Sequence, residues 1–96
     1  MLNINVRTIL GMEKYLGGRK HQVIEMQENS DVMDLLNHLE DIFGEDFKHA
    51  IFDDQRNLNK GIALMLNGIN IMVREGFYMK LREGDSLLIF PPAVGG

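Results

Sequence analysis

The residue types best suited to chemistry stand at the end of the sequence, which reads Phe90-Pro91-Pro92-Ala93-Val94-Gly95-Gly96. The two prolines favour a stiff, extended path out of the preceding segment. The two glycines have no Cβ, so their backbone can enter a narrow channel in another protein. The carboxyl group of Gly96 is ionised at neutral pH and could attack a phosphate group. This arrangement predicts an arm that presents a reactive carboxylate to a partner's active site.

An inert tail that ends in glycine by coincidence is the alternative interpretation of these residues. Glycine accounts for 10 of the 96 residues, so a terminal pair is uncommon by chance. The Pro-Pro pair directly after a strand-like run makes coincidence a weaker explanation. A cloning remnant would not continue a strand so coherently. We therefore favour a functional arm.

The other reactive residue types show no arrangement typical of catalysis or metal binding. The absence of cysteine excludes disulfides, cysteine–zinc sites and a thiol nucleophile. The three histidines, His21, His38 and His49, are not spaced along the sequence as metal ligands usually are. The acidic pair Asp53-Asp54 lacks the spacing of a calcium-binding loop, and Ser30 and Ser86 have no triad context. We expect no catalytic residue, no metal site and no cofactor bound by the chain itself.

The length of the chain predicts a single small domain, and its charge argues against nucleic-acid binding. Ninety-six residues suffice for one small domain with one core. The formal net charge is −4 and the basic residues are scattered, so the concentrated positive field that nucleic acid requires is not expected. No apolar run reaches the ~20 residues that span a bilayer, and the start of the chain does not resemble a signal peptide. We expect a soluble cytoplasmic protein that binds neither nucleic acid nor membrane.

Hydrophobic periodicity predicts two strands and a helix in the first half of the chain. Leu2–Leu10 alternates with period two, as a half-buried strand does. A second β-prone run covers His21–Gln27, and residues 11–20 form a loop between the two. Asn29-Ser30-Asp31 is a good helix start, and Gly44 stands where a helix commonly ends. Apolar residues recur on one helical face between them, at Val32, Leu35, Leu36, Leu39, Ile42 and Phe43.

The sequence pattern of the second half of the chain predicts three further strands. Residues 45–61 are polar and irregular, and we expect turns there. Asn67-Gly68 lies between the apolar runs 62–66 and 69–73, which is a strong hairpin signal because both turn positions need a positive φ. Residues 76–82 form a short turn or a single helical turn. After the turn at Gly84-Asp85, the last strand covers Ser86–Phe90, and the prolines must end it. The sum is an α+β roll in which one main helix covers one face of a mixed sheet of about five strands.

The sequence from Gly84 to Gly96 resembles the ending of the MoaD/ThiS family of ubiquitin-like sulfur carriers. The matching pattern is Gly-Asp, an apolar strand, Pro-Pro, two residues and Gly-Gly. The Asn67-Gly68 hairpin, the strand order, the single helix and the Gly17-Gly18 loop also fit, so the resemblance extends over the whole chain. It implies the ubiquitin-like β-grasp fold, with residues 1–90 as the domain and residues 91–96 as a flexible tail.

The resemblance implies a carrier and substrate rather than an enzyme. In such families an adenylating enzyme of the MoeB/ThiF type uses ATP to join AMP to the terminal carboxylate, here that of Gly96. A persulfide then displaces AMP, which leaves a thiocarboxylate that delivers sulfur inside a second partner. The ending most resembles the small subunit of molybdopterin synthase. The expected second partner is therefore the large subunit of that enzyme or another sulfur-accepting enzyme.

The resemblance also assigns roles to the end of the chain. The residues expected to thread the partner's channel ahead of Gly96 are Ala93, Val94 and Gly95. Alternate side chains of a strand point to opposite faces, so Leu88 and Phe90 share one face of the last strand. We expect the partner interface to comprise Leu88, Phe90, Pro91 and Pro92. The alternative is that Phe90 belongs to the core, as aromatic residues of small domains usually do.

Other functions remain open at this point. A protein modifier, attached through Gly96 to lysines of other proteins, begins with the same acyl adenylate as a sulfur carrier. Carriers for thiamine, cysteine or tRNA thiolation are further alternatives, and the long segment 45–61 is similar to that of cysteine-biosynthesis and archaeal-type members. An interaction domain with an inert tail is the remaining alternative.

Overall fold

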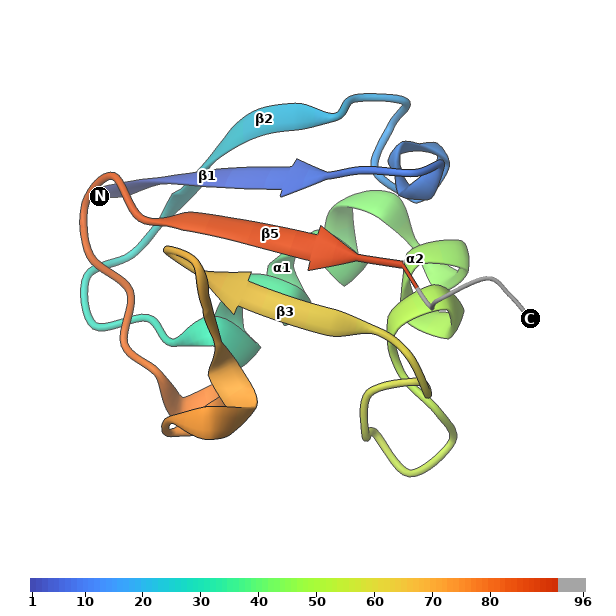
Figure 1. Cartoon of the computed structure of the whole chain (residues 1–96). Helices are drawn as coiled ribbons and strands as arrows, with labels where there is room; N and C mark the ends of the chain where they lie inside the picture. Colours follow the sequence, from blue (N-terminus) through green and yellow to red (C-terminus); the bar gives the residue numbers. More distant parts are fainter. Residues whose placement is uncertain (92–96) are drawn as a thin grey trace.

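The computed structural model describes residues 1–91, and these residues form a five-stranded mixed sheet packed on two helices. The strand order is β2-β1-β5-β3-β4. The strands are β1 (Leu2–Thr8), β2 (His21–Met26), β3 (Ala63–Leu66), β4 (Ile69–Asn70) and β5 (Ser86–Phe90). The first and last strands lie parallel in the middle of the sheet, and every other pairing is antiparallel (Figure 1). The predicted α+β roll is confirmed.

The main helix, α1 (Val32–Phe43), forms where the sequence predicted it. Asp31 accepts a hydrogen bond from the Asp34 backbone amide, and the Asp34 carboxylate accepts one from the Asp31 amide, a reciprocal cap that satisfies two free amides. The apolar face is buried against the sheet at Val32, Leu35, Leu36 and Leu39. Ile42, which we expected on that face, is 48% exposed, because it lies at the margin of the apolar stripe and in the last turn.

The predicted irregular segment 45–61 is wrong in its first half, which is the helix α2 (Glu45–Ile51). Phe47 and Ile51 are four residues apart, so both side chains lie on one face of this helix, and both are completely buried. The predicted turns do occur in the second half. There the Asp53 carboxylate accepts hydrogen bonds from the backbone amides of Gln55 and Asn57.

Residues 1–91 also contain three 3-10 helices: η1 (Met12–Tyr15), η2 (Ile71–Val73) and η3 (Gly76–Tyr78). The strand expected over residues 69–73 therefore stops at Asn70, whose side chain accepts a hydrogen bond from the Met72 amide and starts η2. The predicted hairpin turn is confirmed, since Asn67 and Gly68 both have positive φ. The helical turn predicted within residues 76–82 is η3.

Both α-helices lie on the same side of the sheet, and the core lies between the two layers (Figure 1). The alternating burial of β1 and β5 follows from this arrangement, because every second side chain points toward the helices. On the opposite side of the sheet, here called the open face, neither α1 nor α2 lies. Within residues 1–91, no helix is long and apolar enough to cross a membrane.

Candidate partner-binding surface

The last strand presents two different faces, as its sequence predicted. Leu87 and Ile89 are completely buried under the helices. Leu88 and Phe90 lie on the open face, and both are half-buried. The side chain of Phe90 thus remains partly accessible beside Pro91, which is also half-buried. The expected contact residues Leu88, Phe90 and Pro91 are therefore neighbours at the end of β5.

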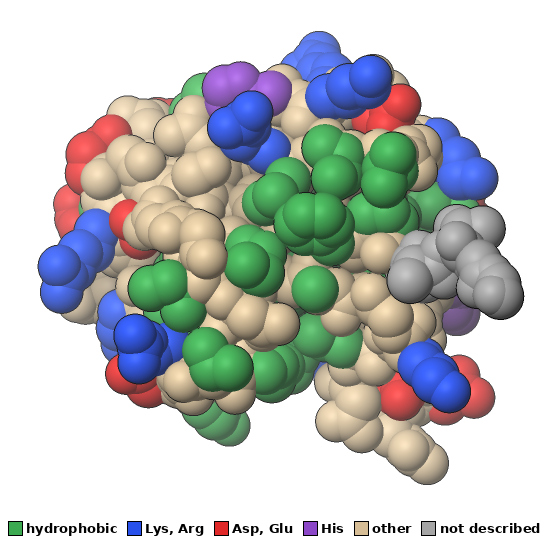
Figure 2. All heavy atoms as spheres, in the orientation of Figure 1, with side chains coloured by type: hydrophobic (Ala, Val, Ile, Leu, Met, Phe, Trp, Pro, Cys, Tyr) green, Lys and Arg blue, Asp and Glu red, His purple; other side chains and the backbone are tan. Residues whose placement is uncertain are grey.

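Strand pairing places residues from four strands in one row across the open face. Arg7 of β1 is paired with His21 of β2 on one side and with Leu88 on the other. Leu88 is paired in turn with Met65 of β3. Apolar side chains gather around this row at the end of the sheet from which the chain leaves, and Lys and Arg side chains line its upper edge (Figure 2).

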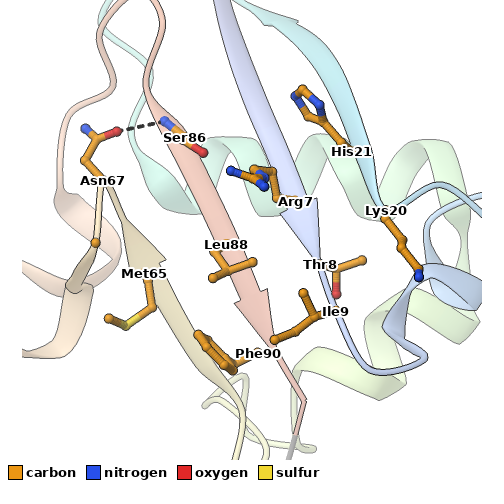
Figure 3. A pocket seen from close by; sticks show the side chains of 11 residues that line it. Arg7, Thr8, Ile9, Lys20, His21, Met65, Asn67, Ser86, Leu88 and Phe90 are labelled. Atoms are coloured by element: carbon orange, nitrogen blue, oxygen red, sulfur yellow. Dashed lines mark hydrogen bonds between the residues drawn. The ribbon is translucent and has the colours of Figure 1, made fainter.

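A groove of about 440 Å³ runs along this part of the sheet, and we call it the open-face groove. Figure 3 shows Phe90 and Ile9 close together at the end of β5, with Leu88 and Met65 beside them and Arg7, Lys20 and His21 on the other side. The lining residues are Arg7, Thr8, Ile9, Lys20, His21, Met65, Asn67, Gly68, Ser86, Leu88 and Phe90.

Two side chains hold β5 in place at its ends. At the start of the strand, the Asn67 side chain accepts a hydrogen bond from the Ser86 amide at 2.9 Å and donates one to the Asp85 carboxylate. At the far end, the buried Thr8 hydroxyl donates to the carbonyl oxygen of Ile89 at 3.0 Å. These contacts fix the strand that leads into Phe90 and Pro91.

Of the residues that line the groove, sequence reasoning proposed Leu88 and Phe90 as partner contacts, and it predicted neither the groove nor its polar side. The alternation of β1 placed Arg7 opposite the buried residues, but its role depends on which strand lies next to β1. The Thr8 bond links residues 81 positions apart, and no local pattern signals it. For Asn67, we inferred only the turn, although its side chain also ties β3 to β5.

The remaining residues predicted for the site, Pro92, Ala93, Val94, Gly95 and Gly96, lie outside the described residues.

The histidines are dispersed: His21 is hydrogen-bonded to Asn5, His38 is exposed on α1, and His49 pairs with Glu45. Among residues 1–91, no three His, Asp or Glu side chains are grouped as metal ligands.

The model of the ThiS family matches residues 7–96. The match covers nearly the whole chain, and this protein therefore belongs to the ThiS family of ubiquitin-like sulfur carriers. Proteins of this class work with E1-like activating enzymes and with sulfur-accepting enzymes. A comparison with curated proteins found no match.

Solved structures with the same fold confirm the ubiquitin-like β-grasp. The small archaeal modifier protein 1 of Methanosarcina acetivorans is 25% identical, with a TM-score of 0.82 over 100% of this chain and 98% of that one. A putative molybdopterin converting factor subunit 1 from Pyrococcus furiosus is 22% identical, with a TM-score of 0.76 over 97% and 100%. A chain of the BexX/CysO complex of Amycolatopsis orientalis is 20% identical, with a TM-score of 0.77 over 97% and 99%.

Proposed function

We propose that this protein carries sulfur as a thiocarboxylate on Gly96 and delivers it in the biosynthesis of molybdopterin. The observation that carries the proposal is the match to the ThiS family, which extends to Gly96. The structure supports it by placing β5, which leads to the arm, at the centre of the sheet between β1 and β3. The arm thus starts from a rigid element, as a group that must be aimed at a partner's active site requires.

The chemistry requires two reactions of the terminal carboxyl group. In the first, a carboxylate oxygen of Gly96 attacks the α-phosphorus of ATP, which forms an acyl adenylate and releases pyrophosphate. In the second, a protein persulfide attacks the acyl carbon and AMP leaves. A thiol then cleaves the resulting S–S bond, becomes oxidised to a disulfide, and leaves the thiocarboxylate on Gly96. The adenylating partner, of the MoeB/ThiF type, binds the ATP, and this chain supplies the reacting carboxylate.

The partner contacts in this proposal lie on the open face. Leu88 and Phe90 line the open-face groove where the chain leaves β5, and Pro91 follows directly. Half-buried apolar side chains at such a position can bury further area against a partner without leaving the core. Pro92 would extend this contact, and Ala93, Val94 and Gly95 would thread the channel.

The reconstituted reaction tests the proposal. The protein is incubated with the adenylating enzyme of its own organism, ATP, a persulfide donor and a thiol, and its intact mass is measured. We expect an increase of about 16 Da, the difference between sulfur and oxygen, on Gly96. A variant that lacks Gly96 serves as the control and should remain unmodified. A natural protein that stays unmodified, although the enzyme is active on another carrier, would contradict the proposal.

Delivery to the second partner tests the pathway. The thiocarboxylated protein is mixed with the molybdopterin synthase large subunit and its pterin precursor, and the dithiolene product is measured. Product formation supports the molybdopterin assignment. If the thiocarboxylate forms and the large subunit neither binds nor consumes it, the sulfur serves thiamine, cysteine or tRNA thiolation instead.

A protein modifier is the second candidate. It is favoured by the small archaeal modifier protein 1 of Methanosarcina acetivorans, which is 25% identical over the whole of this chain. In this case a lysine amine attacks the activated carbonyl carbon of Gly96 and forms an isopeptide bond. Peptide mass spectrometry of the natural host would then find the last residues of this chain on lysines of other proteins.

A further inference from the structure

We propose that this protein forms a symmetric dimer through the outer edge of β2, in which the β2 strands of two copies pair antiparallel and join the two sheets into one. The inference does not depend on the proposed function, because it concerns an edge of the sheet and not the arm. A strand at the edge of a sheet has unpaired backbone groups that can pair with another chain.

The outer edge of β2 is free within residues 1–91. β2 stands at one end of the strand order, and β1 is the strand beside it (Figure 1). The pairing with β1 continues without a bulge from His21 to Met26. Edge strands are usually protected by proline, lysine or a bulge, and none of these occurs in β2. This edge can therefore accept a further strand.

The hydrogen bonds to β1 fix which backbone groups of β2 point outward. The Thr8 amide donates to the carbonyl oxygen of Lys20 at 2.9 Å, so the even-numbered residues of β2 are bonded to β1. The backbone amides and carbonyl groups of His21, Val23 and Glu25 therefore point away from the sheet. These three residues are symmetric about Val23. A second β2 strand that runs antiparallel, with Val23 opposite Val23, would satisfy all of these groups.

The side chains along this edge complement a second copy of themselves. Val23 pairs with Asn5 on the open face and is 56% exposed, and in this register it would contact the same residue of the other copy. The His21 ring is held on the open face by a 2.9 Å hydrogen bond to Asn5. His21 would lie opposite Glu25 of the other copy. Glu25 is exposed and forms no salt bridge with any residue in the range 1–91.

The charges along β2 favour the antiparallel arrangement. The exposed residues Arg19 and Lys20 precede the strand, whereas Glu25 and Glu28 lie near its end and are also exposed. Antiparallel pairing places the basic start of each strand beside the acidic end of the other, which is attractive, and parallel pairing would place like charges together. The partner that fits this edge is therefore a second copy of the chain, related by a two-fold axis at Val23.

Single-cysteine variants test this register, because the chain contains no cysteine of its own. Hydrogen-bonded residues of antiparallel strands have Cα atoms about 5.5 Å apart, a distance that a disulfide spans. With the thiol oxidant diamide, Val23→Cys should form a cross-linked dimer. Glu25→Cys should not cross-link to itself, since its two copies would lie about 13 Å apart along the strands, but it should cross-link to His21→Cys. Val73→Cys, at an exposed position of η2, is the control for random collisions.

We expect Val23→Cys to cross-link at least about tenfold faster than Val73→Cys at the same concentration, because pairing raises the effective concentration of the two thiols. The mixture of His21→Cys and Glu25→Cys should also exceed the control. Equal rates for Val23→Cys and Val73→Cys would overturn the inference. So would a Glu25→Cys variant that cross-links to itself as fast as Val23→Cys does.

Sedimentation equilibrium tests the association of the natural protein. Between about 0.05 and 1 mM, the apparent mass should rise from that of one chain toward twice that value. Val23→Lys, which places two like charges at the two-fold axis, should remain a monomer, and Val73→Lys should associate as the natural protein does. A natural protein that is still monomeric at about 1 mM would contradict the dimer. Association abolished by Val73→Lys and retained by Val23→Lys would exclude the β2 edge. Unfolding curves in urea show that each variant is folded.

Discussion

At the residue scale, the buried Thr8 hydroxyl links the first strand to the last strand. β1 ends at this residue, because the chain turns away at Leu10, whose φ is positive. No further β1 residue continues the ladder, and the Thr8 side chain donates to the carbonyl oxygen of Ile89. The end of β5 thus stays bonded up to the residue before Phe90. A buried carbonyl without this donor would lack a hydrogen-bond partner.

We expect Thr8→Val, which keeps the side-chain shape and removes the donor, to lower the free energy of unfolding by about 1–2 kcal/mol. Amide hydrogen exchange at the end of β5 should become faster. Thr8→Ser is the control, because it keeps the hydroxyl and should keep the exchange protection of that segment. Urea unfolding and exchange measured by NMR provide both values. A valine variant as stable and as protected as the natural protein would show that the bond contributes nothing.

Period-two alternation was enough to predict the face on which each β5 residue lies. Leu88 and Phe90 are on the open face, as predicted, while Leu87 and Ile89 are buried. Alternation does not give the depth of burial, which depends on neighbouring strands. Phe90 is half-buried since Ala63 of β3 lies beside it and Ile9 lies close by. For the same reason, the sequence did not predict a groove.

At the element scale, α1 could be predicted and α2 could not. The reciprocal cap at Asp31 and the repeated apolar positions mark α1 over three turns. The seven residues of α2 have no side-chain cap, and Gly44, which directly precedes α2, is also the residue at which α1 ends. Its only signal is the pair Phe47 and Ile51. A seven-residue helix is stable here because these side chains enter the core, and such tertiary packing overrides weak local preference.

The Phe47→Ala variant tests whether α2 is part of the core. We expect it to lower the free energy of unfolding by about 3–5 kcal/mol, because a completely buried aromatic ring leaves a cavity. Phe47→Leu should cost less, and Asp46→Ala, at an exposed position, should change stability by less than about 0.5 kcal/mol. Urea denaturation gives all three values. A loss below about 1 kcal/mol for the alanine variant would show that this segment packs loosely.

At the scale of the whole molecule, the first and last strands lie together at the centre of the sheet. β1 and β5 are parallel, and residues near the two ends of the chain form the same groove. The family resemblance implied the β-grasp fold, whereas periodicity alone gave the strands without the order in which they pair. Within the described part of the chain, the core residues extend from Leu2 to Ile89. A change confined to the last residues of the chain should therefore affect the reaction of the arm and leave the free energy of unfolding unchanged.

Deletion of Gly95 and Gly96 tests this separation. We expect the free energy of unfolding to change by less than about 0.5 kcal/mol, because the deletion keeps every core residue of the range 1–91. Adenylation should be abolished, since the reacting carboxylate would be displaced from the partner's active site. An inert tail predicts no functional change at all. Substantial destabilisation would contradict the separation of core and arm.

The most direct test of the central claim is the mass of the protein isolated from its natural host. We predict a population heavier by about 16 Da, with the added sulfur assigned to Gly96 by fragmentation. Protein found only with an unmodified carboxylate, even when the cells contain the active adenylating enzyme and a sulfur donor, would contradict the account of this chain as a sulfur carrier.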